Sequence, residues 1–422
     1  MTRLVLHIGT EKTGSTTIQK FLDVNRDALS DRRFYTPRTM GNPTTSAVNH
    51  LALCILAQNP DTEYKTPRLL AGIQDGEVED FVRTERLRFE AEMSSLPPFV
   101  HTVVMSSEFL HSQLVDPDEI NRLYSYLSQL FSEIEILVYL RRQDLLALSL
   151  FSTRIKGGEP WPKEVFPEID NDIPYYFDYL ALLKNYADVF GGNSVKVRKF
   201  EKAAFTGGRL TEDFLDAVGL TQEDSLIGVE DHNPSLDVAA LKLLAALNPY
   251  VPPFLAGKWN PLRNGLVELL EKHFQGKSMI ATRSKAKRFY SNFKHSNETA
   301  RRLFAPHFEA PLFLEDFGSY PLKAKAVADL PAALATMVAV LWNEHAKDLN
   351  DSRAEASYLA IELMKSAKLP RDVISGYYER TLRLHGDWPK IHDSYAHWLS
   401  SLGETELAEH HVEIARSLAS QH

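Results

Sequence analysis

Short apolar runs alternate with helical patterns along about the first 200 residues of the chain. Four apolar runs predict β-strands, at Leu4–Ile8, Val100–Met105, Ile134–Leu140 and Ser194–Val197. Helical spacing of apolar side chains follows the first strand at Ile18, Phe21 and Leu22, and two further helices are predicted over Asp116–Phe131 and Asp144–Ile155. Strands that alternate with helices indicate a parallel sheet covered on both faces. The pattern therefore predicts a three-layer α/β/α domain.

From about Leu210 the strand patterns stop and helical patterns take over. The predicted helices are Thr211–Val218, Leu236–Leu247, Leu262–Phe274, Ala286–Phe293 and Glu298–Phe304. Ser296 lies just before the last of them and is a plausible N-cap. A segment rich in aromatic and proline residues, Ala310–Leu322, is typical of a domain end. We therefore expect an α/β domain over residues 1–320 and an all-α region over residues 321–422.

The all-α region contains a weak repeat pattern. Gly403, Ala408 and Ala415 are spaced by 5 and 7 residues, which resembles one tetratricopeptide repeat. A weaker copy lies 34 residues earlier, with Tyr378 in register with Val412. A plain helical hairpin is the alternative interpretation. The uncharged run Leu330–Trp342 is far shorter than the ~20 residues that span a bilayer, so it predicts a buried helix.

Composition narrows the class of protein. The chain has 422 residues, of which 44% are hydrophobic and 24% charged, as in ordinary globular proteins. Its net charge of −9 is a poor match for nucleic acid or an anionic membrane. The single cysteine, Cys54, can form neither an internal disulfide nor a multi-cysteine metal site. With no signal-peptide pattern and no transmembrane run, we expect a cytoplasmic protein.

The segment Gly9-Thr-Glu-Lys-Thr-Gly-Ser-Thr-Thr17 lies between a predicted strand and an amphipathic helix. Backbone N–H groups of such a turn, together with the positive end of the following helix, form an anion site. Gly14 lets the backbone approach the anion closely, and Ser15, Thr16 and Thr17 offer hydroxyl donors. Lys12 adds a mobile positive charge. The segment therefore predicts a phosphate-binding loop.

The loop departs from the nucleotide-triphosphate pattern G-x-x-x-x-G-K-[ST]. Gly9 and Gly14 have the right spacing, but Ser15 stands where that pattern has lysine. The second strand ends in Ser106-Ser107-Glu108, without a convincing metal-binding aspartate. The loop is thus suited to phosphate and poorly suited to Mg²⁺-triphosphate chemistry. A P-loop kinase for a small molecule remains the alternative enzyme.

The loop resembles the 5′-phosphosulfate-binding loop of sulfotransferases that use 3′-phosphoadenosine 5′-phosphosulfate (PAPS). A second motif, Val138-Tyr-Leu-Arg-Arg-Gln-Asp-Leu-Leu-Ala-Leu-Ser149, runs from a strand end into a helix. That family has an arginine at this strand end and a serine eight residues later, both on the 3′-phosphate, which here are Arg141 and Ser149. Arg142 is the alternative arginine. The resemblance implies a P-loop-type fold over about residues 1–320, with the nucleotide bound by Lys12, Thr13, Gly14, Ser15, Thr16, Thr17, Arg141 and Ser149.

Other segments add weaker support and one departure. Lys199-Phe-Glu201 and Asn233-Pro-Ser-Leu236 are similar to patterns in bacterial sulfotransferases. The Gly-x-x-Gly-x-x-Lys segment that cytosolic eukaryotic members carry near their C-terminus is not visible. A basic cluster in the corresponding region could cover the nucleotide, although a solvated helix face explains it equally well: Arg283, Lys285, Lys287 and Arg288.

The resemblance also implies the catalytic groups. Moving the sulfuryl group from PAPS to an acceptor leaves 3′-phosphoadenosine 5′-phosphate (PAP), and needs a base for the acceptor proton and a cation near the bridging oxygen, but no metal. Lys12 is the candidate cation. The base is expected after the second strand, where Glu108 is the first candidate and His111 the second; Glu108 as a mere helix cap is the third interpretation. His7, inside a strand, is expected to be a core residue.

The sequence contains few indications of the identity of the acceptor. Aromatic residues that could stack on a sugar or phenol, or simply pack in the core, are Trp161, Tyr175, Tyr176, Phe177 and Tyr179. The insertion Arg38–Glu92 is expected to shape the acceptor entrance. Because bacterial members resembling this chain often act on carbohydrate or lipid-linked glycans, we expect a glycan or small-molecule acceptor. The non-enzymatic alternative is an inactive interaction protein that recruits a protein partner through its C-terminal helices.

Overall fold

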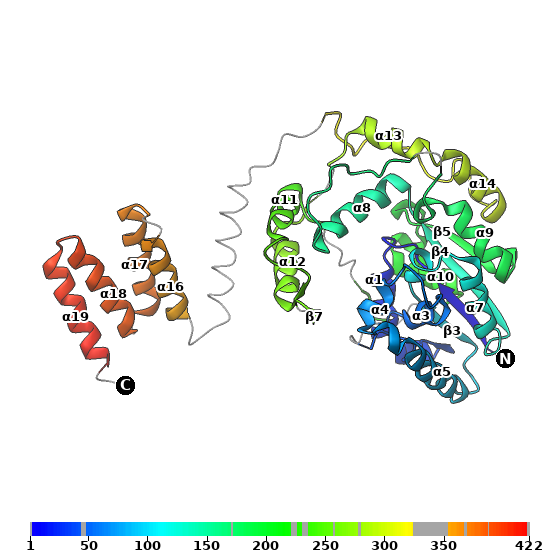
Figure 1. The fold of residues 1–422 in the computed structure, drawn as a ribbon, viewed down its shortest axis with the longest axis horizontal. Helices are drawn as coiled ribbons and strands as arrows, with labels where there is room; N and C mark the ends of the chain where they lie inside the picture. Colours follow the sequence, from blue (N-terminus) through cyan, green and yellow to red (C-terminus); the bar gives the residue numbers. More distant parts are fainter. Residues whose placement is uncertain are drawn as a thin grey trace. The chain divides into compact units, whose positions relative to one another are not determined.

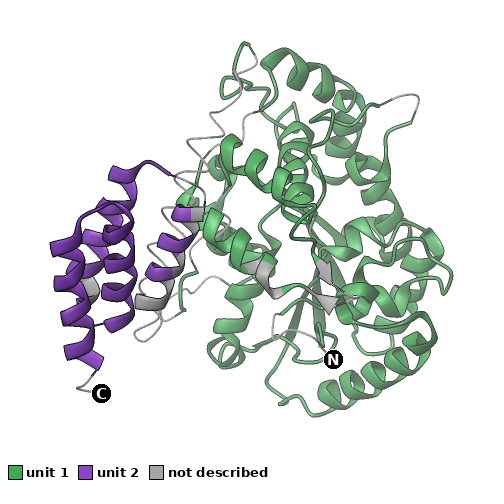
Figure 2. Cartoon of the chain, turned by 60° about the vertical axis from the view of Figure 1, so that its left-hand side comes forward, with its two compact units in different colours: residues 1–328 green, residues 329–422 purple. Residues whose placement is uncertain are grey.

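The chain forms two compact units, residues 1–328 and 329–422 (Figure 2). The computed structural model describes residues 2–43, 48–169, 172–220, 226–229, 235–255, 258–276, 280–323, 353–366, 369–386 and 388–419. The predicted helix Leu330–Trp342 lies outside these residues, as do Asn233 and Pro234 of the segment similar to bacterial sulfotransferases. The assignment of residues 1–320 and 321–422 to particular families stays a prediction.

A five-stranded sheet forms the centre of the first unit (Figure 1). Its strands are β1 (Arg3–His7), β2 (Phe34–Tyr35), β3 (Thr102–Ser106), β4 (Glu133–Leu140) and β5 (Val195–Lys199). They lie in the order β2-β3-β1-β4-β5, and every neighbouring pair is parallel. All four predicted strands are confirmed, and the parallel order brings the carboxyl ends of β1, β3, β4 and β5 to one edge.

Alternating side chains divide the core into two clusters, one on each face of the sheet. Val5 and Leu137 pack in the cluster that contains α1 (Ser15–Val24) and α10 (Leu210–Val218). Leu6 and Ile136 pack in the other cluster, which contains α3 (Ala52–Ala57), α7 (Pro117–Leu127), α8 (Gln143–Lys156) and α9 (Tyr179–Phe190). Helices thus cover both faces, which confirms the three-layer α/β/α class.

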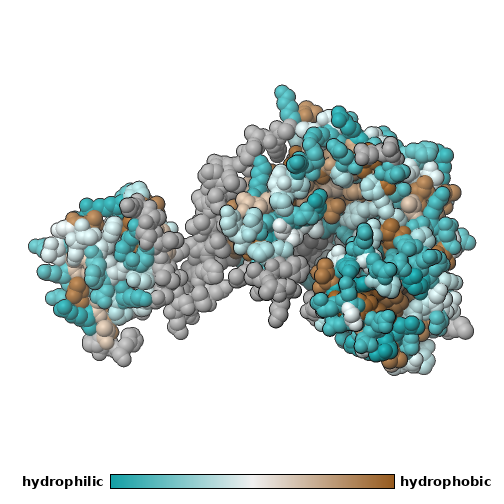
Figure 3. All heavy atoms as spheres, in the orientation of Figure 1, coloured by the Kyte–Doolittle hydropathy of each residue, from teal (hydrophilic) through white to brown (hydrophobic). Residues whose placement is uncertain are grey.

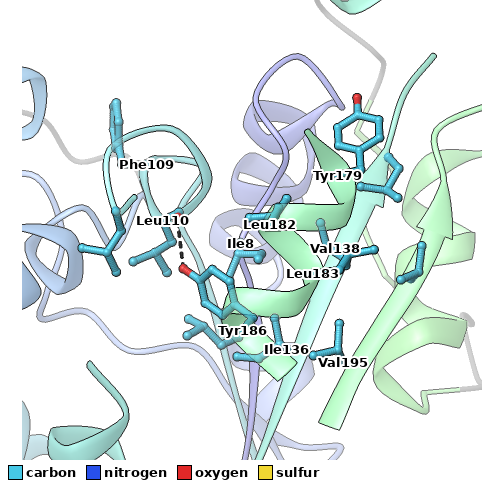
Figure 4. Packing of buried hydrophobic residues seen from close by; sticks show 14 of the residues in the cluster. Ile8, Phe109, Leu110, Ile136, Val138, Tyr179, Leu182, Leu183, Tyr186 and Val195 are labelled. Carbon is cyan, nitrogen blue, oxygen red and sulfur yellow. Dashed lines mark hydrogen bonds between the residues drawn. The ribbon is translucent and has the colours of Figure 1, made fainter. Parts of the chain in front are cut away.

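The α9 side of the core shows how tightly this layer is joined to the sheet. Leu182 and Leu183 of α9 pack over Ile136 and Val138 of β4 (Figure 4). The Tyr186 hydroxyl donates a hydrogen bond of 2.8 Å to the Leu110 carbonyl, which satisfies a buried polar group inside the layer (Figure 4). The segment after β3 is therefore held against α9.

Further helices lie before β4 and after β5. Those before β4 are α2 (Arg26–Ser30), α4 (Thr66–Ala71), α5 (Val78–Ser94) and α6 (Phe109–Ser112). Those after α10 are α11 (Val238–Leu247), α12 (Pro261–His273), α13 (Arg283–Ser291) and α14 (Lys294–Phe304). The five helices predicted between residues 211 and 304 are thus all found, with ends that differ by up to four residues.

Three sequence-based details are wrong. Strand β2 was missed because its two residues are too few to show a period. The expectation that strands stop at Leu210 overlooked an antiparallel pair, β6 (Phe254–Leu255) and β7 (Lys258–Trp259). Ser296 is no N-cap, because α14 begins two residues earlier and the buried Ser296 hydroxyl donates to the Phe293 carbonyl at 3.1 Å.

The second unit contains two helical hairpins among its described residues. Their helices are α16 (Arg353–Ser366), α17 (Arg371–His385), α18 (Pro389–Ser401) and α19 (Thr405–Ala419). Helix α17 begins at residue 371 and α19 at 405, and they end at 385 and 419, so both ends are displaced by 34 residues. Ile374 and Ala408, which this displacement superposes, are both buried in the same cluster. The tetratricopeptide assignment of this unit stays a prediction.

Polar residues dominate the visible surface, with hydrophobic ones in scattered patches (Figure 3). Within the described part of the chain, no helix combines the length and the apolar character that a membrane crossing requires.

Candidate functional site

The loop between β1 and α1 can form only because residue 14 is glycine. Gly14 precedes α1 with a φ of 75°, in the left-handed region. A Cβ atom at this position would lie 2.3 Å from the Leu210 side chain and 3.2 Å from the Phe200 ring. The predicted close approach of backbone at Gly14 is thus a packing requirement from α10 and from the residue that follows β5.

Hydrogen bonds fasten the loop to the end of β4. The backbone N–H and the hydroxyl of Thr10 both donate to the Tyr139 carbonyl, at 3.0 and 3.1 Å. The buried Thr13 hydroxyl donates to the Thr10 carbonyl at 2.5 Å. Arg141, the first residue after β4, donates from Nη1 to the Lys12 carbonyl at 2.8 Å. The structure therefore brings two parts of the predicted nucleotide site, Lys12 and Arg141, into contact.

A cleft of about 730 Å³ opens beside this loop. Its lining comes from the loop and α1, from the segment after β3, from α8 and from the residues before α9: Glu11, Lys12, Ser15, Thr16, Tyr64, Thr66, Glu108, Phe109, Ser112, Gln113, Val115, Leu150, Arg154, Pro174, Tyr175 and Tyr176. The cleft lies at the carboxyl edge of the sheet, where ligands bind in open α/β folds.

Lys12 presents a charged group to this cleft. The residue is half-buried, and its ammonium group has no hydrogen-bond or ion-pair partner among the described residues. Burial lowers the pKa of Lys12, while the nearby Glu11 carboxylate opposes that change. An incompletely solvated cation without a fixed partner interacts strongly with an incoming anion.

Glu108 faces the same cleft from the carboxyl end of β3. The residue immediately precedes α6 and is half-buried. Its Oε2 accepts a hydrogen bond of 2.6 Å from Gln19 Nε2, and its Oε1 accepts one of 3.3 Å from Asn49 Nδ2. Burial raises the pKa of Glu108 above the ordinary glutamate value of 4.5. A raised pKa makes the carboxylate a better proton acceptor.

His111 has different surroundings. It is fully buried, its Nδ1 accepts from the Glu11 backbone N–H at 3.3 Å, and its Nε2 lies 3.2 Å from the Tyr176 carbonyl. Burial lowers the pKa of His111 to about 4. Both ring nitrogens of His111 are engaged with backbone, and of the two candidate residues only Glu108 lines the cleft.

The two neighbouring arginines have separate environments. Arg141 lies half-buried beside the loop, with its guanidinium 5.4 Å from the Phe200 ring centre. Arg142 is buried, and it donates to both carboxylate oxygens of Asp144 at 2.6 and 2.9 Å and to the carbonyls of Leu314 and Asp316. The donors of Arg142 thus hold the 310–320 segment to α8, whereas Arg141 lies beside the loop; which of the two contacts a 3′-phosphate stays a prediction.

The remaining predicted nucleotide residues are distributed around the loop. Ser15 and Thr16 line the cleft, whereas the Thr17 side chain is buried beneath it. Ser149 is half-buried on the second turn of α8, two turns from Arg141. None of Thr13, Thr17, Arg141 and Ser149 borders the cleft itself. If they contact a nucleotide, it extends beyond this cleft along α8.

The basic cluster lies on α13 and at its start. Arg283 Nη2 donates to the Gly318 carbonyl at 3.1 Å, and Lys285 forms an exposed ion pair of 2.8 Å with Glu164. The Lys287 ammonium lies 5.9 Å from the Phe317 ring centre. Arg288 is exposed. Three of the four side chains thus contact other parts of the first unit, and a role of the cluster in covering a nucleotide stays a prediction.

The aromatic residues divide between cleft and core. Tyr175 and Tyr176 line the cleft. Phe177 and Tyr179 are buried, and Trp161 packs edge-on against Phe151 with ring centres 5.2 Å apart. From the insertion Arg38–Glu92, Tyr64 and Thr66 reach the cleft wall, and a role of the insertion at an acceptor entrance stays a prediction.

Sequence reasoning missed several polar residues of the site, among them Glu11, Gln19, Asn49 and Arg154. Glu11 lines the cleft and accepts from the Tyr176 hydroxyl at 2.9 Å. Gln19 and Asn49 hold Glu108, and Arg154 lines the cleft while paired with Glu159. Glu11 and Gln19 could have been found from their place on the loop and one turn into α1, but Asn49 comes from a distant insertion without any pattern.

The described residues include no group of three or more histidine, cysteine or acidic side chains that could hold a metal ion. No known protein family's profile matches the chain. An uncharacterized protein from Archaeoglobus fulgidus is 27% identical over 206 residues, which cover 49% of this chain and 53% of that protein. The chain thus spans about half the length of the curated relative that it matches.

Among solved structures, the crystal structure of a sulfotransferase from Alicyclobacillus acidocaldarius is similar to this chain. The match covers 58% of this chain and 92% of that one, with 18% sequence identity and a TM-score of 0.33. A likeness at this score carries no argument about activity, which therefore rests on the geometry of the cleft.

Proposed function

We propose that this protein is a sulfotransferase that moves the sulfuryl group of PAPS to a hydroxyl or amine of an acceptor. The observation that carries this proposal is that Lys12 and Glu108 line one cleft, beside a strand-to-helix loop in which the Lys12 carbonyl accepts a hydrogen bond from Arg141. The loop suits a 5′-phosphosulfate, and the forked guanidinium of Arg141 suits a 3′-phosphate. PAP is the expected product, and the reaction needs no metal.

Glu108 and Lys12 have separate roles in the proposed reaction. Glu108 accepts the proton of the acceptor hydroxyl as the new oxygen–sulfur bond forms, and the bond between sulfur and the bridging oxygen breaks. Negative charge develops on the departing phosphate oxygen, where the Lys12 ammonium stabilises it. Backbone N–H groups at the start of α1, with Ser15 and Thr16, hold the 5′-phosphosulfate.

The acceptor is expected to be a carbohydrate or glycan. Support comes from the tyrosines on the cleft wall, Tyr64, Tyr175 and Tyr176, whose rings offer flat apolar faces beside polar groups. A cleft of about 730 Å³ is within the size range of small-molecule sites.

Equilibrium binding of PAP, measured by titration calorimetry, tests the nucleotide assignment. We expect PAP to bind more tightly than 5′-AMP, and Arg141→Met or Ser149→Ala to remove this preference while 5′-AMP binding is little changed. Arg198→Met, a substitution of the same type on the edge strand β5, is the control and should leave PAP affinity intact. Equal binding of PAP and 5′-AMP by the wild-type chain would refute the proposal.

A second experiment tests the base. Glu108→Gln keeps the size of the side chain and removes its proton affinity, so sulfuryl transfer should fall by about 10²–10⁴-fold with PAP affinity unchanged. Unchanged turnover would assign the base to another residue.

Two other functions make opposite predictions. A small-molecule kinase should bind ATP in a Mg²⁺-dependent manner, which Ser15 in place of the usual lysine disfavours. An inactive interaction protein should lose its partner when residues 325–422 are deleted, whereas the proposed enzyme should retain PAP binding in that variant.

A further inference from the structure

Two side-chain amides from separate parts of the first unit hold the Glu108 carboxylate. Gln19 lies on α1, and its Nε2 donates to Glu108 Oε2 at 2.6 Å. Asn49 lies in the insertion, and its Nδ2 donates to Glu108 Oε1 at 3.3 Å. Each carboxylate oxygen therefore has its own amide donor, which restricts rotation of the carboxylate about its last bond.

The amides are themselves held in place. Gln19 Nε2 lies 3.4 Å from Ser106 Oγ, and that hydroxyl is 2.8 Å from the buried His7 Nδ1. Asn49 Oδ1 accepts from Ser107 Oγ at 3.3 Å. The supports of both amides thus come from the end of β3, the strand that also positions Glu108.

An amide that is hydrogen-bonded to an ionised carboxylate can take only one orientation. An ionised carboxylate only accepts hydrogen bonds, so each amide must turn its NH₂ group toward Glu108. Such bonds favour the ionised form, while burial of Glu108 favours the protonated form. The amides therefore keep a partly buried carboxylate available as a proton acceptor near neutral pH.

Gln19 also links the base to the anion-binding loop. It follows Ser15 by one helical turn on α1, and both side chains are buried on the same face of that helix. Ser15 lines the cleft at the loop, and Gln19 donates a hydrogen bond to Glu108. One rigid helix thus carries both a candidate donor to the cosubstrate and a donor to the candidate base.

We propose that Gln19 and Asn49 are positioning residues, which keep Glu108 ionised and aimed at the acceptor. This inference rests on the proposed function for its catalytic consequence, but the state of the Glu108 carboxyl can be measured without any turnover.

The experiment uses the full chain with Gln19→Met, which preserves side-chain length and removes the amide. The Glu108 carboxyl is titrated by ¹³C NMR, with Glu108→Gln to assign its signal. We expect the titration of Glu108 to move to higher pH in Gln19→Met, and further in Gln19→Glu, where a second carboxylate repels the charged form. Gln129→Met, an exposed glutamine whose amide donates to the Ser125 carbonyl, is the control and should leave the titration unchanged.

Turnover gives a second readout. In Gln19→Met and Asn49→Leu, kcat should fall by about tenfold to a hundredfold at neutral pH, within the range of general base catalysis, with the KM for PAPS unchanged. The acidic limb of the pH–rate profile should move to higher pH in both variants. A purely structural role for the amides would lower the melting temperature without moving that limb.

The two proposals fail in different ways. If folded Gln19→Met and Gln19→Glu titrate Glu108 as the wild type does, the positioning role is refuted, whatever the activity. If the wild-type chain neither binds PAP nor transfers a sulfuryl group, the proposed function fails, and the titration alone decides whether the amides stabilise the carboxylate.

Discussion

Two cavities of the first unit have similar size but opposite character. At the carboxyl end of the sheet, the cleft of about 730 Å³ contains Lys12, whose ammonium has no ion-pair partner among the described residues, and Glu108, which is held by neutral amides. Beside the edge strand β5, a cavity of about 600 Å³ is lined by Arg3, Glu135, Lys196 and Arg198, among others.

The charges of the cavity beside β5 are mostly paired with each other or with neighbours. Arg3 contacts Glu135 at 3.1 Å, and Arg198 contacts Asp213 at 3.3 Å and Asp216 at 2.8 Å. Paired charges stabilise the fold and have little capacity left for a ligand, whereas a cation without a partner still has its interaction energy available. A cavity therefore indicates function through the state of its charges more than through its size.

The sharpest way to break this comparison is to remove one lysine from each cavity. Lys12→Met should lower kcat for sulfuryl transfer by about 10³-fold, because the developing negative charge loses its stabilising cation. Lys196→Met removes an exposed lysine that lines the cavity beside β5 and should leave kcat within about twofold, since exposed charges far from the reaction contribute little. Steady-state kinetics measure both, and equal effects would contradict the difference between the two cavities.

Acid should destabilise the first unit through histidines gathered near the carboxyl end. Burial lowers the pKa of His7 to about 3 and those of His50 and His111 to about 4. Their unfolded value is 6.5, so below that pH the unfolded chain binds more protons than the folded one, and stability falls as pH falls toward 4. Each imidazole should contribute a slope of about 1.4 kcal/mol per pH unit in this window.

Denaturant unfolding at pH 7 and pH 5 measures this slope. His111→Asn should make the dependence shallower by the contribution of one imidazole. A stability that stays constant between pH 6.5 and 4 would show that the three imidazoles are not kept neutral by burial.

Gly14→Ala tests whether the loop is shaped by its neighbours or by backbone freedom alone. The added methyl group meets both a positive φ and the Leu210 side chain, so we expect a loss of about 2–4 kcal/mol in stability and weaker PAP binding. Gly208 has a φ of 79°, and no atom lies within 4 Å of a Cβ added there. Gly208→Ala should therefore lower the free energy of unfolding by only about 1 kcal/mol. Equal losses in the two variants would mean that packing against α10 does not shape the loop.

The smallest expected effect is that of Arg198→Met on β5. This substitution leaves Asp213 with the Tyr139 hydroxyl at 2.6 Å and the Thr206 N–H at 3.0 Å, so the carboxylate keeps hydrogen-bond donors. We expect a loss of about 1 kcal/mol in the free energy of unfolding, and no change in PAP affinity. A large loss of PAP affinity would show that the cavity beside β5 takes part in binding.

Much of the fold could be predicted because long elements repeat their apolar pattern. Strand β4 has five buried residues in a row from Ile136 to Leu140, and α1 places Ile18 and Leu22 on one face. Strand β2 could not be predicted, because Phe34 and Tyr35 show no period and are placed only by pairing with Thr102 and Val103.

The candidate site was predictable only in part, for a related reason. Lys12, Ser15 and Thr16 stand in one short motif whose geometry is local, and they do line the cleft. The separate environments of Arg141 and Arg142 could not be predicted locally, because they depend on Asp144 and on carbonyls about 170 residues away.

The sequence by itself determined the three-layer class, and it predicted an anion site in the loop between β1 and α1 and the group of residues that contains the candidate base. These follow from local periodicity and from the rule that parallel strands bring their carboxyl ends to one edge. Only the tertiary structure decided that Glu108 faces the cleft while His111 is buried against backbone, and that Gln19 and Asn49 hold the Glu108 carboxylate. The physical reason is that burial and hydrogen-bond partners arise from segments far apart in the chain, and these set which side chain keeps its charge available.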